Sequence, residues 1–250
     1  MNELALFAGT GGGILGGKLL GWKTVCAVEL DDYARRVLLA RQDDGCLPHF
    51  PIWDDVRTFD GKPWRGLVDV ISGGFPCQDV AAGSSTKTGI DGERSGLWSH
   101  MARIICEVGC RQVLVENSPA ITARGLGRVL SDLAAMGYDA RWGVFSAAEV
   151  GARHERARMF IAADRNGFVG DPRPWSFQQY GQNEDVGTLH QTVPCDCVRN
   201  WLEMARQCAR MDDGATDYVD RVAAIGNGQY PAVVRLAWNT LSNAATNNQR

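Results

Sequence analysis

The spacing of apolar residues predicts alternating strands and helices over the first two thirds of the chain. Short apolar runs typical of strands occur at 4–7, 24–28, 69–72, 113–115, 139–147 and 158–163. Between them, helices are predicted after the glycine-rich turn at 9–13, over 31–41 and over 122–136. This alternation indicates an α/β domain whose mostly parallel sheet has helices on both faces, and the last two runs are expected to form a closing hairpin.

The strand and helix pattern is lost after Asp164. Residues 165 to 196 are rich in Gly, Pro, Gln and Asn, which marks a domain boundary. We therefore expect a main domain over 1–165 and a small irregular region over 166–220, with a helix at 198–210. A C-terminal segment at 221–243 contains a predicted helix at 232–241, and 244–250 is expected to be a disordered tail.

Composition limits the compartment and the class of protein. The chain has 250 residues, 45% of them hydrophobic and 22% charged, which suits one α/β domain with a small appendage. No apolar run approaches the roughly 20 residues of a membrane helix, and the N-terminus lacks the basic start of a secretory signal. We therefore expect a cytoplasmic protein with no membrane partner, whose eight cysteines are free thiols. The net charge of -3 gives no general attraction to nucleic acid, so any such binding needs local basic clusters.

A cofactor site is predicted where the first two strands end. Gly11, Gly13 and Gly16 fit G-x-G-x-x-G after a strand and before a helix, and Glu29 follows the next strand. Glycines let a ligand approach the backbone, and an acid there can accept hydrogen bonds from ribose hydroxyls. This motif is compatible with either NAD or S-adenosylmethionine.

A nucleophile and an acid are predicted at the same rim of the sheet. Cys77 follows a buried strand, two glycines and Pro76, so its thiol is expected at the rim rather than in the core. Glu116 ends another apolar strand, where burial is expected to raise its pKa and keep it protonated.

A basic cluster precedes the last strand of the main domain. Arg156 and Arg158, with Arg153 nearby, form a basic patch whose alternating members point to one side if this segment is extended, which suits a phosphate or a carbonyl oxygen. The alternative is a solvated, charged strand end.

Six segments resemble, in order, the motifs of the cytosine-5 DNA methyltransferase family. They are FAGTGG at 7–12, GFPCQ at 74–78, RSGL at 94–97, EN at 116–117, RAR at 156–158 and GN at 226–227. The short segment at 217–221 resembles the compact bacterial and bacteriophage members. Ser118 and His154 depart from the residues usual in the family, and both are neighbours of the chemistry.

The resemblance implies a Rossmann-like, S-adenosylmethionine-dependent methyltransferase fold. It implies that Cys77 is the nucleophile that attacks C6 of a flipped cytosine, that Glu116 bonds its N3, that Arg158 holds the base and that Arg156 supports the loop or a phosphate. The cofactor pocket would comprise Phe7, Gly9, Gly11, Gly12, Glu29, Leu30, Asp55, Val56, Pro76, Leu97 and Asn227. Residues 77–97 would form a mobile loop over the target base, 166–220 the target-recognition region, and 221–243 would pack back on the catalytic domain.

The expected partner is double-stranded DNA, and the expected protein is a monomeric enzyme of a bacterial host, of the kind found in restriction-modification systems. A tRNA cytosine-5 methyltransferase remains an alternative, because it carries the same catalytic motifs. An NAD-dependent oxidoreductase would not need Pro76 and Cys77, and a non-catalytic DNA-binding relative would not need the whole catalytic set. A zinc site is not expected, because the C-x-C spacing of the nearest candidates departs from the usual one; those candidates are His190, Cys195, Cys197 and Cys208.

Overall fold

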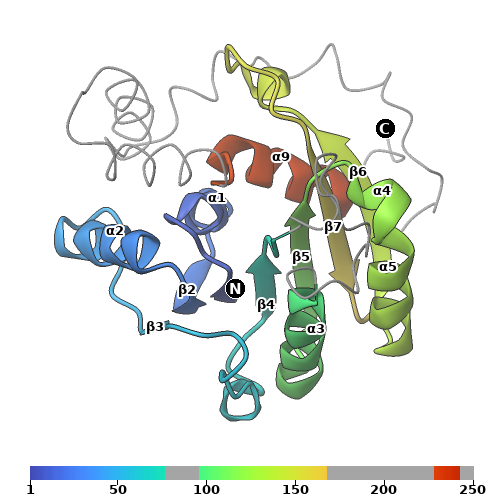
Figure 1. Ribbon diagram of the computed structural model, residues 1–250, viewed down its shortest axis with the longest axis horizontal. Coiled ribbons are helices and arrows are strands. Elements are labelled where there is room, and N and C mark those ends of the chain that lie inside the picture. Colours follow the sequence, from blue (N-terminus) through green and yellow to red (C-terminus); the bar gives the residue numbers. More distant parts are fainter. Residues whose placement is uncertain (77–95, 168–227, 243–250) are drawn as a thin grey trace, which may run out of the picture.

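The computed structural model describes residues 1–76, 96–167 and 228–242, and within them a seven-stranded sheet forms the centre of the protein (Figure 1). Its order is β3-β2-β1-β4-β5-β7-β6. The strands are β1 (Asn2–Leu6), β2 (Lys23–Val28), β3 (Ile52–Trp53), β4 (Val70–Gly73), β5 (Gln112–Asn117), β6 (Asp139–Phe145) and β7 (Arg158–Asp164). All pairings from β3 to β5 are parallel, whereas β7 runs antiparallel to β5 and β6. The predicted, mostly parallel sheet with a closing hairpin is therefore confirmed.

Helices connect these strands. They are α1 (Gly12–Leu19), α2 (Asp32–Asp43), α3 (Leu97–Val108), α4 (Ile121–Arg124), α5 (Leu126–Ala135) and α9 (Pro231–Ser242), with 3-10 turns η1 (Lys62–Trp64) and η3 (Ala147–Val150). The predicted helix at 31–41 is confirmed, and the side chain of Asp31 caps it by accepting a 2.7 Å hydrogen bond from the N–H of Ala34. The predicted helix at 122–136 is divided at Gly125 into α4 and α5. The segments at 168–227 and 243–250, with their predicted helix and tail, lie outside the described residues.

The alternation of side chains along the strands builds a core on each face of the sheet. Leu4, Leu6, Val113 and Val115 pack with α3 and α5 on one face. The residues between them in sequence face the other way: Ala5 packs with α1 and α2, and Leu114 packs with α9. Figure 1 shows α9 beside α1, and α9 also contacts β6 and β7. Helices on both faces are thus confirmed, and residues 231–242 pack against α1, β6 and β7.

The chain order creates a switch point between β1 and β4. β1 pairs with β2 on one side and with β4 on the other, so the connections leave these two neighbouring strands in opposite directions. Ligands of open α/β sheets bind at the carboxyl ends of strands at such a point. Within the described residues, none of the helices has both the length and the apolar character needed to cross a bilayer.

Candidate active site

The turn after β1 is tightly curved and closely covered. Gly9 and Gly11 have φ of +54° and +91°, and Gly11 serves as the N-cap of α1. A Cβ on Gly12 would overlap the backbone carbonyl of Gln229, and a Cβ on Gly13 would lie 2.8 Å from the Gln229 side-chain oxygen. Only glycine therefore lets the segment before α9 lie on the start of α1.

Glu29 ties this turn to the end of β2. Its carboxylate accepts hydrogen bonds of 2.6 Å from the N–H of Gly9 and 2.8 Å from the N–H of Asp31. Burial raises the pKa of Glu29, while the bonds from Asp31 and Gly9 oppose that rise. Leu30, beside it, is 59% exposed and presents an apolar side chain at the rim. These positions meet the requirements of a ribose-binding acid next to an apolar contact.

Asp55 and Val56 begin the loop that follows β3. Val56 is buried in the core, whereas the carboxylate of Asp55 is partly exposed. Hydrogen bonds from Arg57 lower the pKa of Asp55, so it stays ionised at neutral pH and can accept hydrogen bonds.

Glu116 is a buried carboxyl close to two arginines. It lies on β5, 3.1 Å from Nε of Arg158 at the start of β7. Burial raises its pKa to about 7, as expected, and the charges of Arg158 and Arg156 oppose that rise. The ion pair favours the carboxylate and burial favours the acid, so both forms are populated near neutral pH. A Cβ on Gly74 would collide with the Glu116 carboxyl, which shows how closely the end of β4 approaches this acid.

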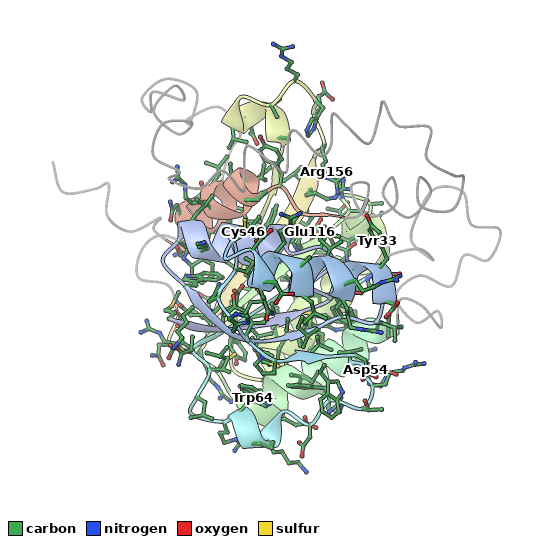
Figure 2. The ribbon with its side chains drawn as sticks, turned by 90° about the vertical axis from the view of Figure 1, so that its left-hand side faces the viewer. Tyr33, Cys46, Asp54, Trp64, Glu116 and Arg156 are labelled. Atoms are coloured by element: carbon green, nitrogen blue, oxygen red, sulfur yellow. The ribbon has the colours of Figure 1, made fainter. Side chains whose placement is uncertain are left out.

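Arg156 reaches the same place by an unexpected path. The segment before β7 is not extended: residues 153 and 154 form a bend, and Arg156 has a φ of +32°, so the expected alternation of arginine side chains is wrong. Nη2 of Arg156 donates to the carbonyl of Gly228, just before α9. Burial lowers the pKa of Arg156, as does the charge of Arg158, while Glu116 opposes the change. Figure 2 shows Arg156 near Glu116 and far from Trp64 of the loop below.

In the part of the chain that the structure describes, the non-glycine residues with strained backbone lie at this rim. Among the described non-glycine residues, only Phe7, with a φ of +52°, and Arg156 adopt positive φ. Side chains other than glycine rarely adopt this conformation, and it persists where the surrounding structure holds it, most often at functional sites.

The chain is firmly held as far as Phe75, two residues before Cys77. Phe75 is buried against Trp98, with ring centroids 5.5 Å apart, and its carbonyl accepts a 3.1 Å hydrogen bond from Nδ2 of Asn117. Pro76 follows and is exposed. Cys77 itself lies outside the described residues, as do the rest of the expected loop up to residue 95 and Asn227. Leu97 is described, at the start of α3 and partly buried against the core.

The structure adds residues that the sequence did not single out. Gly228 and Gln229 contact Arg156 and the glycine-rich turn, respectively, and their only signal was proximity to the GN motif at 226–227. In the described part of the chain there is no group of three or more His, Cys, Asp or Glu side chains arranged to hold a metal ion. The four candidate zinc ligands lie outside it.

Comparisons with known proteins bear on both the fold and the family. The fold resembles the Dnmt2 methyltransferase of S. pombe, with a TM-score of 0.56 and 21% identity over 74% of this chain and 57% of that one. It also resembles the Entamoeba histolytica methyltransferase EhMeth, with a TM-score of 0.58 and 16% identity over 70% and 56%. At these identities the likeness concerns the fold, which is that of Rossmann-like methyltransferases.

Sequence relatives carry the family assignment. The Type II methyltransferase M.Eco47II of Escherichia coli is 31% identical over 172 residues, which is 65% of this chain and 39% of that protein. The Type II methyltransferase M.NgoMIV of Neisseria gonorrhoeae is 28% identical over 220 residues, covering 83% and 67%. The chain spans only about two fifths of the length of the first of these curated relatives. The family described as C-5 cytosine-specific DNA methylase matches residues 1–219, which is most of the sequence. The chain therefore belongs to the C-5 cytosine-specific DNA methylase family.

Proposed function

We propose that this protein is a DNA (cytosine-5-)-methyltransferase that transfers a methyl group from S-adenosylmethionine to cytosine. The observation that carries the proposal is Glu116, a buried acid with a pKa of about 7 beside two arginines, at the rim where the chain leads into Cys77. Such an acid can hold a proton for a ring nitrogen at neutral pH.

The cofactor would lie over the ends of β1 and β2. Within the turn at 7–12, Gly9 has open space where a side chain would stand, so a ligand can approach its backbone. Glu29 offers a carboxylate, and Asp55 and Val56 border the same end of the sheet. S-adenosylmethionine, when bound, supplies an electrophilic methyl group. Pro76, Leu97 and Asn227 complete the proposed pocket.

Cytosine C5 is too weak a nucleophile to take this methyl directly, so the ring must first be activated. The thiolate of Cys77 adds to C6 as Glu116 gives its proton to N3, which places an electron pair at C5. S-adenosylmethionine would supply the methyl group to C5 and would be released as S-adenosylhomocysteine. A base then removes the C5 proton, the C6–S bond breaks to release the thiolate of Cys77, and the N3 proton returns to Glu116. Arg158, paired with Glu116, holds the flipped base, and Arg156, anchored on the carbonyl of Gly228, supports the loop or a phosphate.

Double-stranded DNA is the proposed substrate. The family is described by its action on cytosine in DNA, and the relatives named above are Type II methyltransferases. tRNA is the alternative substrate, and an assay of duplex DNA against tRNA separates the two. Residues 166–220 are proposed to choose the target sequence, and we propose that the enzyme acts as a monomer in the bacterial cytoplasm.

The test begins by sequencing host DNA after expression, with detection of 5-methylcytosine, which reveals the target. A duplex carrying 5-fluorocytosine at that target should then form a permanent adduct, because fluorine cannot leave as the C5 proton does. Peptide mapping should find the adduct on Cys77, and Cys77→Ser should lose nearly all turnover while still binding DNA and cofactor. Attachment at another cysteine, or near wild-type turnover by Cys77→Ser, would refute this mechanism.

A further inference from the structure

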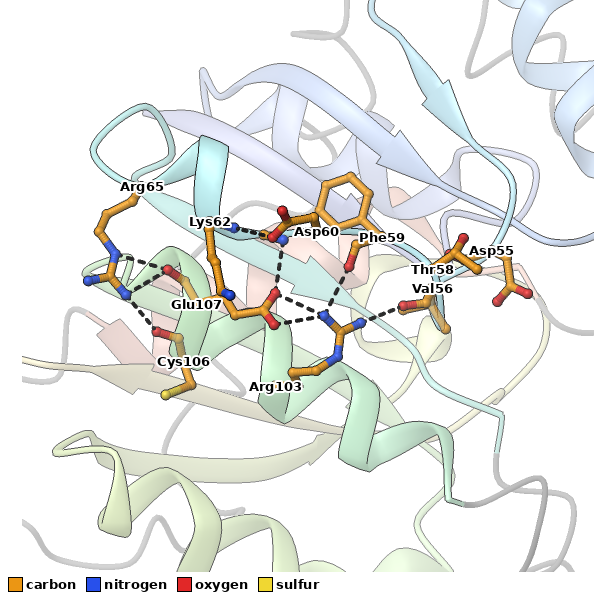
Figure 3. Close-up of polar contacts among 11 residues, drawn as sticks. Asp55, Val56, Thr58, Phe59, Asp60, Lys62, Arg65, Arg103, Cys106 and Glu107 are labelled. Atoms are coloured by element: carbon orange, nitrogen blue, oxygen red, sulfur yellow. Dashed lines mark hydrogen bonds and ion pairs between the residues drawn. The ribbon is translucent and has the colours of Figure 1, made fainter.

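The loop that carries Asp55 and Val56 is held from below by helix α3. This loop runs from β3 through η1 toward β4, and α3 packs along it (Figure 3). Val56 and Phe59 lie in the same core cluster as Trp98 of α3. The position of the loop therefore depends on what α3 presents to it.

Arg103 of α3 binds two carbonyls of this loop at once. Its Nη2 donates to the carbonyl of Val56 and its Nη1 to the carbonyl of Phe59, both at 2.9 Å. The Nη1 group also pairs with the carboxylate of Glu107, one helical turn along, at 2.9 Å. Glu107 in turn accepts a 2.9 Å hydrogen bond from the N–H of Gly61. Arg103 and Glu107 thus hold both ends of the 56–61 segment, as Figure 3 shows.

The chemistry of these contacts indicates that Arg103 positions the 56–61 segment and does not merely form a surface ion pair. An exposed ion pair contributes little by itself, but a guanidinium presents several donors in one rigid plane. Two hydrogen bonds from one charged group to carbonyls three residues apart fix the distance between these carbonyls as well as their direction. Glu107 is largely buried and holds the guanidinium in that orientation.

We propose that Arg103, oriented by Glu107, is a positioning residue for the cofactor site. Arg103 fixes the position of Val56 and does not touch the cofactor itself. Val56 is proposed to contact the adenine of S-adenosylmethionine. This inference rests on the proposed function. Losing Arg103 should weaken cofactor affinity and leave the chemical step at saturating cofactor nearly unchanged.

The experiment compares Arg103→Gln with Arg65→Gln in the full-length chain. Arg65 binds the same loop to the same helix, because its Nε and Nη2 donate to the carbonyl of Glu107 at 3.0 Å and 2.8 Å, and Nη2 also reaches the carbonyl of Cys106 at 3.3 Å. None of these hydrogen bonds involves Val56, so Arg65 serves as the matched control.

Calorimetry should show that Arg103→Gln raises the Kd of S-adenosylmethionine about tenfold, whereas Arg65→Gln changes it by less than about twofold. The kcat of Arg103→Gln at saturating cofactor should stay within about twofold of wild type. Arg103→Lys should bind with intermediate affinity, because an ammonium can reach one carbonyl but lacks the planar fork. If Arg103→Gln does not fold, Arg103→Lys decides the question by the same measurement.

Wild-type affinity in folded Arg103→Gln, or in Arg103→Lys where the glutamine variant fails to fold, would overturn the inference. An equal loss in Arg65→Gln would do the same, since it would point to general loosening of the loop. Val56→Ala distinguishes a failure of the positioning role of Arg103 from a failure of the proposed function. If Val56→Ala weakens binding and the Arg103 variants do not, only the positioning role falls; if wild type binds no S-adenosylmethionine, the proposed function falls.

Discussion

Replacing Glu3 by glutamine should remove most of the pH dependence of stability that this interior carboxyl creates. Glu3 lies on β1, is 0% exposed, and accepts hydrogen bonds from the hydroxyls of Ser72 at 2.6 Å and Thr24 at 2.7 Å. Burial raises its pKa to about 7, and the two hydroxyl bonds oppose the rise only in part. Glutamine has the same shape and resembles the protonated acid.

The size of the effect follows from the difference in pKa between the folded and unfolded chains. The ordinary pKa is 4.5 and the folded value is about 7. At about 1.4 kcal/mol per pH unit, ionising Glu3 costs the folded state about 3 kcal/mol. The pKa of Glu3 is higher in the folded chain than in the unfolded chain. The contribution of protonated Glu3 to the free energy of unfolding is therefore fully present below pH 4.5 and is lost as the pH rises to about 7. Above that pH no further loss is expected from Glu3.

Urea unfolding of wild type and Glu3→Gln between pH 4.5 and pH 8 measures this difference. The free energy of unfolding of the wild type should fall by about 3 kcal/mol more than that of the variant over this range. Glu116 remains in both proteins, so its own contribution cancels. Glu155→Gln, which removes an exposed acid, should follow the wild-type curve. Parallel curves for wild type and Glu3→Gln would refute the reasoning.

Two further predictions concern the cofactor end. Glu29→Ala should raise the Kd of S-adenosylmethionine about tenfold or more by calorimetry, because it removes the proposed ribose contact and also the carboxylate that holds Gly9 and Asp31. The circular dichroism spectrum should stay native, and an unchanged affinity would count against the role of Glu29. Gly12→Ala should destabilise the protein by about 1–3 kcal/mol, because its Cβ would overlap the Gln229 carbonyl. Gly127→Ala, on α5 with open space around its Cβ, should instead stabilise by about 1 kcal/mol, and equal thermal midpoints for the two variants would contradict this account.

The sequence predicted six of the seven strands that the structure describes, because these six are marked by local signals. The runs that became β4 and β5 are apolar and end in glycines or polar residues, and β6 and β7 are long enough to show their hairpin. β3 has two residues, too few for any periodicity. α3 was not predicted, although Trp98, Met101, Ile105 and Val108 recur at helical spacing.

The parts of the site that the sequence could not predict depend on backbone atoms. Arg156 binds a carbonyl of Gly228, and Arg103 binds carbonyls of the 56–61 segment. Every residue carries a carbonyl, so no side-chain pattern marks such partners. The positive φ of Arg156 is equally invisible, because the surrounding structure imposes it against the residue's own preference.

The return of the chain at 228–242 has a consequence for when the protein becomes competent during translation. The carbonyl that anchors Arg156 and the backbone that covers Gly12 both belong to this late segment, and α9 supplies the apolar face that seals Leu114 and Phe160. A nascent chain that has emerged only as far as residue 167 already contains every strand of the sheet, yet it lacks these three contributions. The rim around Arg156 and Gly12 is therefore completed last, and the proposed methyl transfer requires α9 to have left the ribosome and docked against α1.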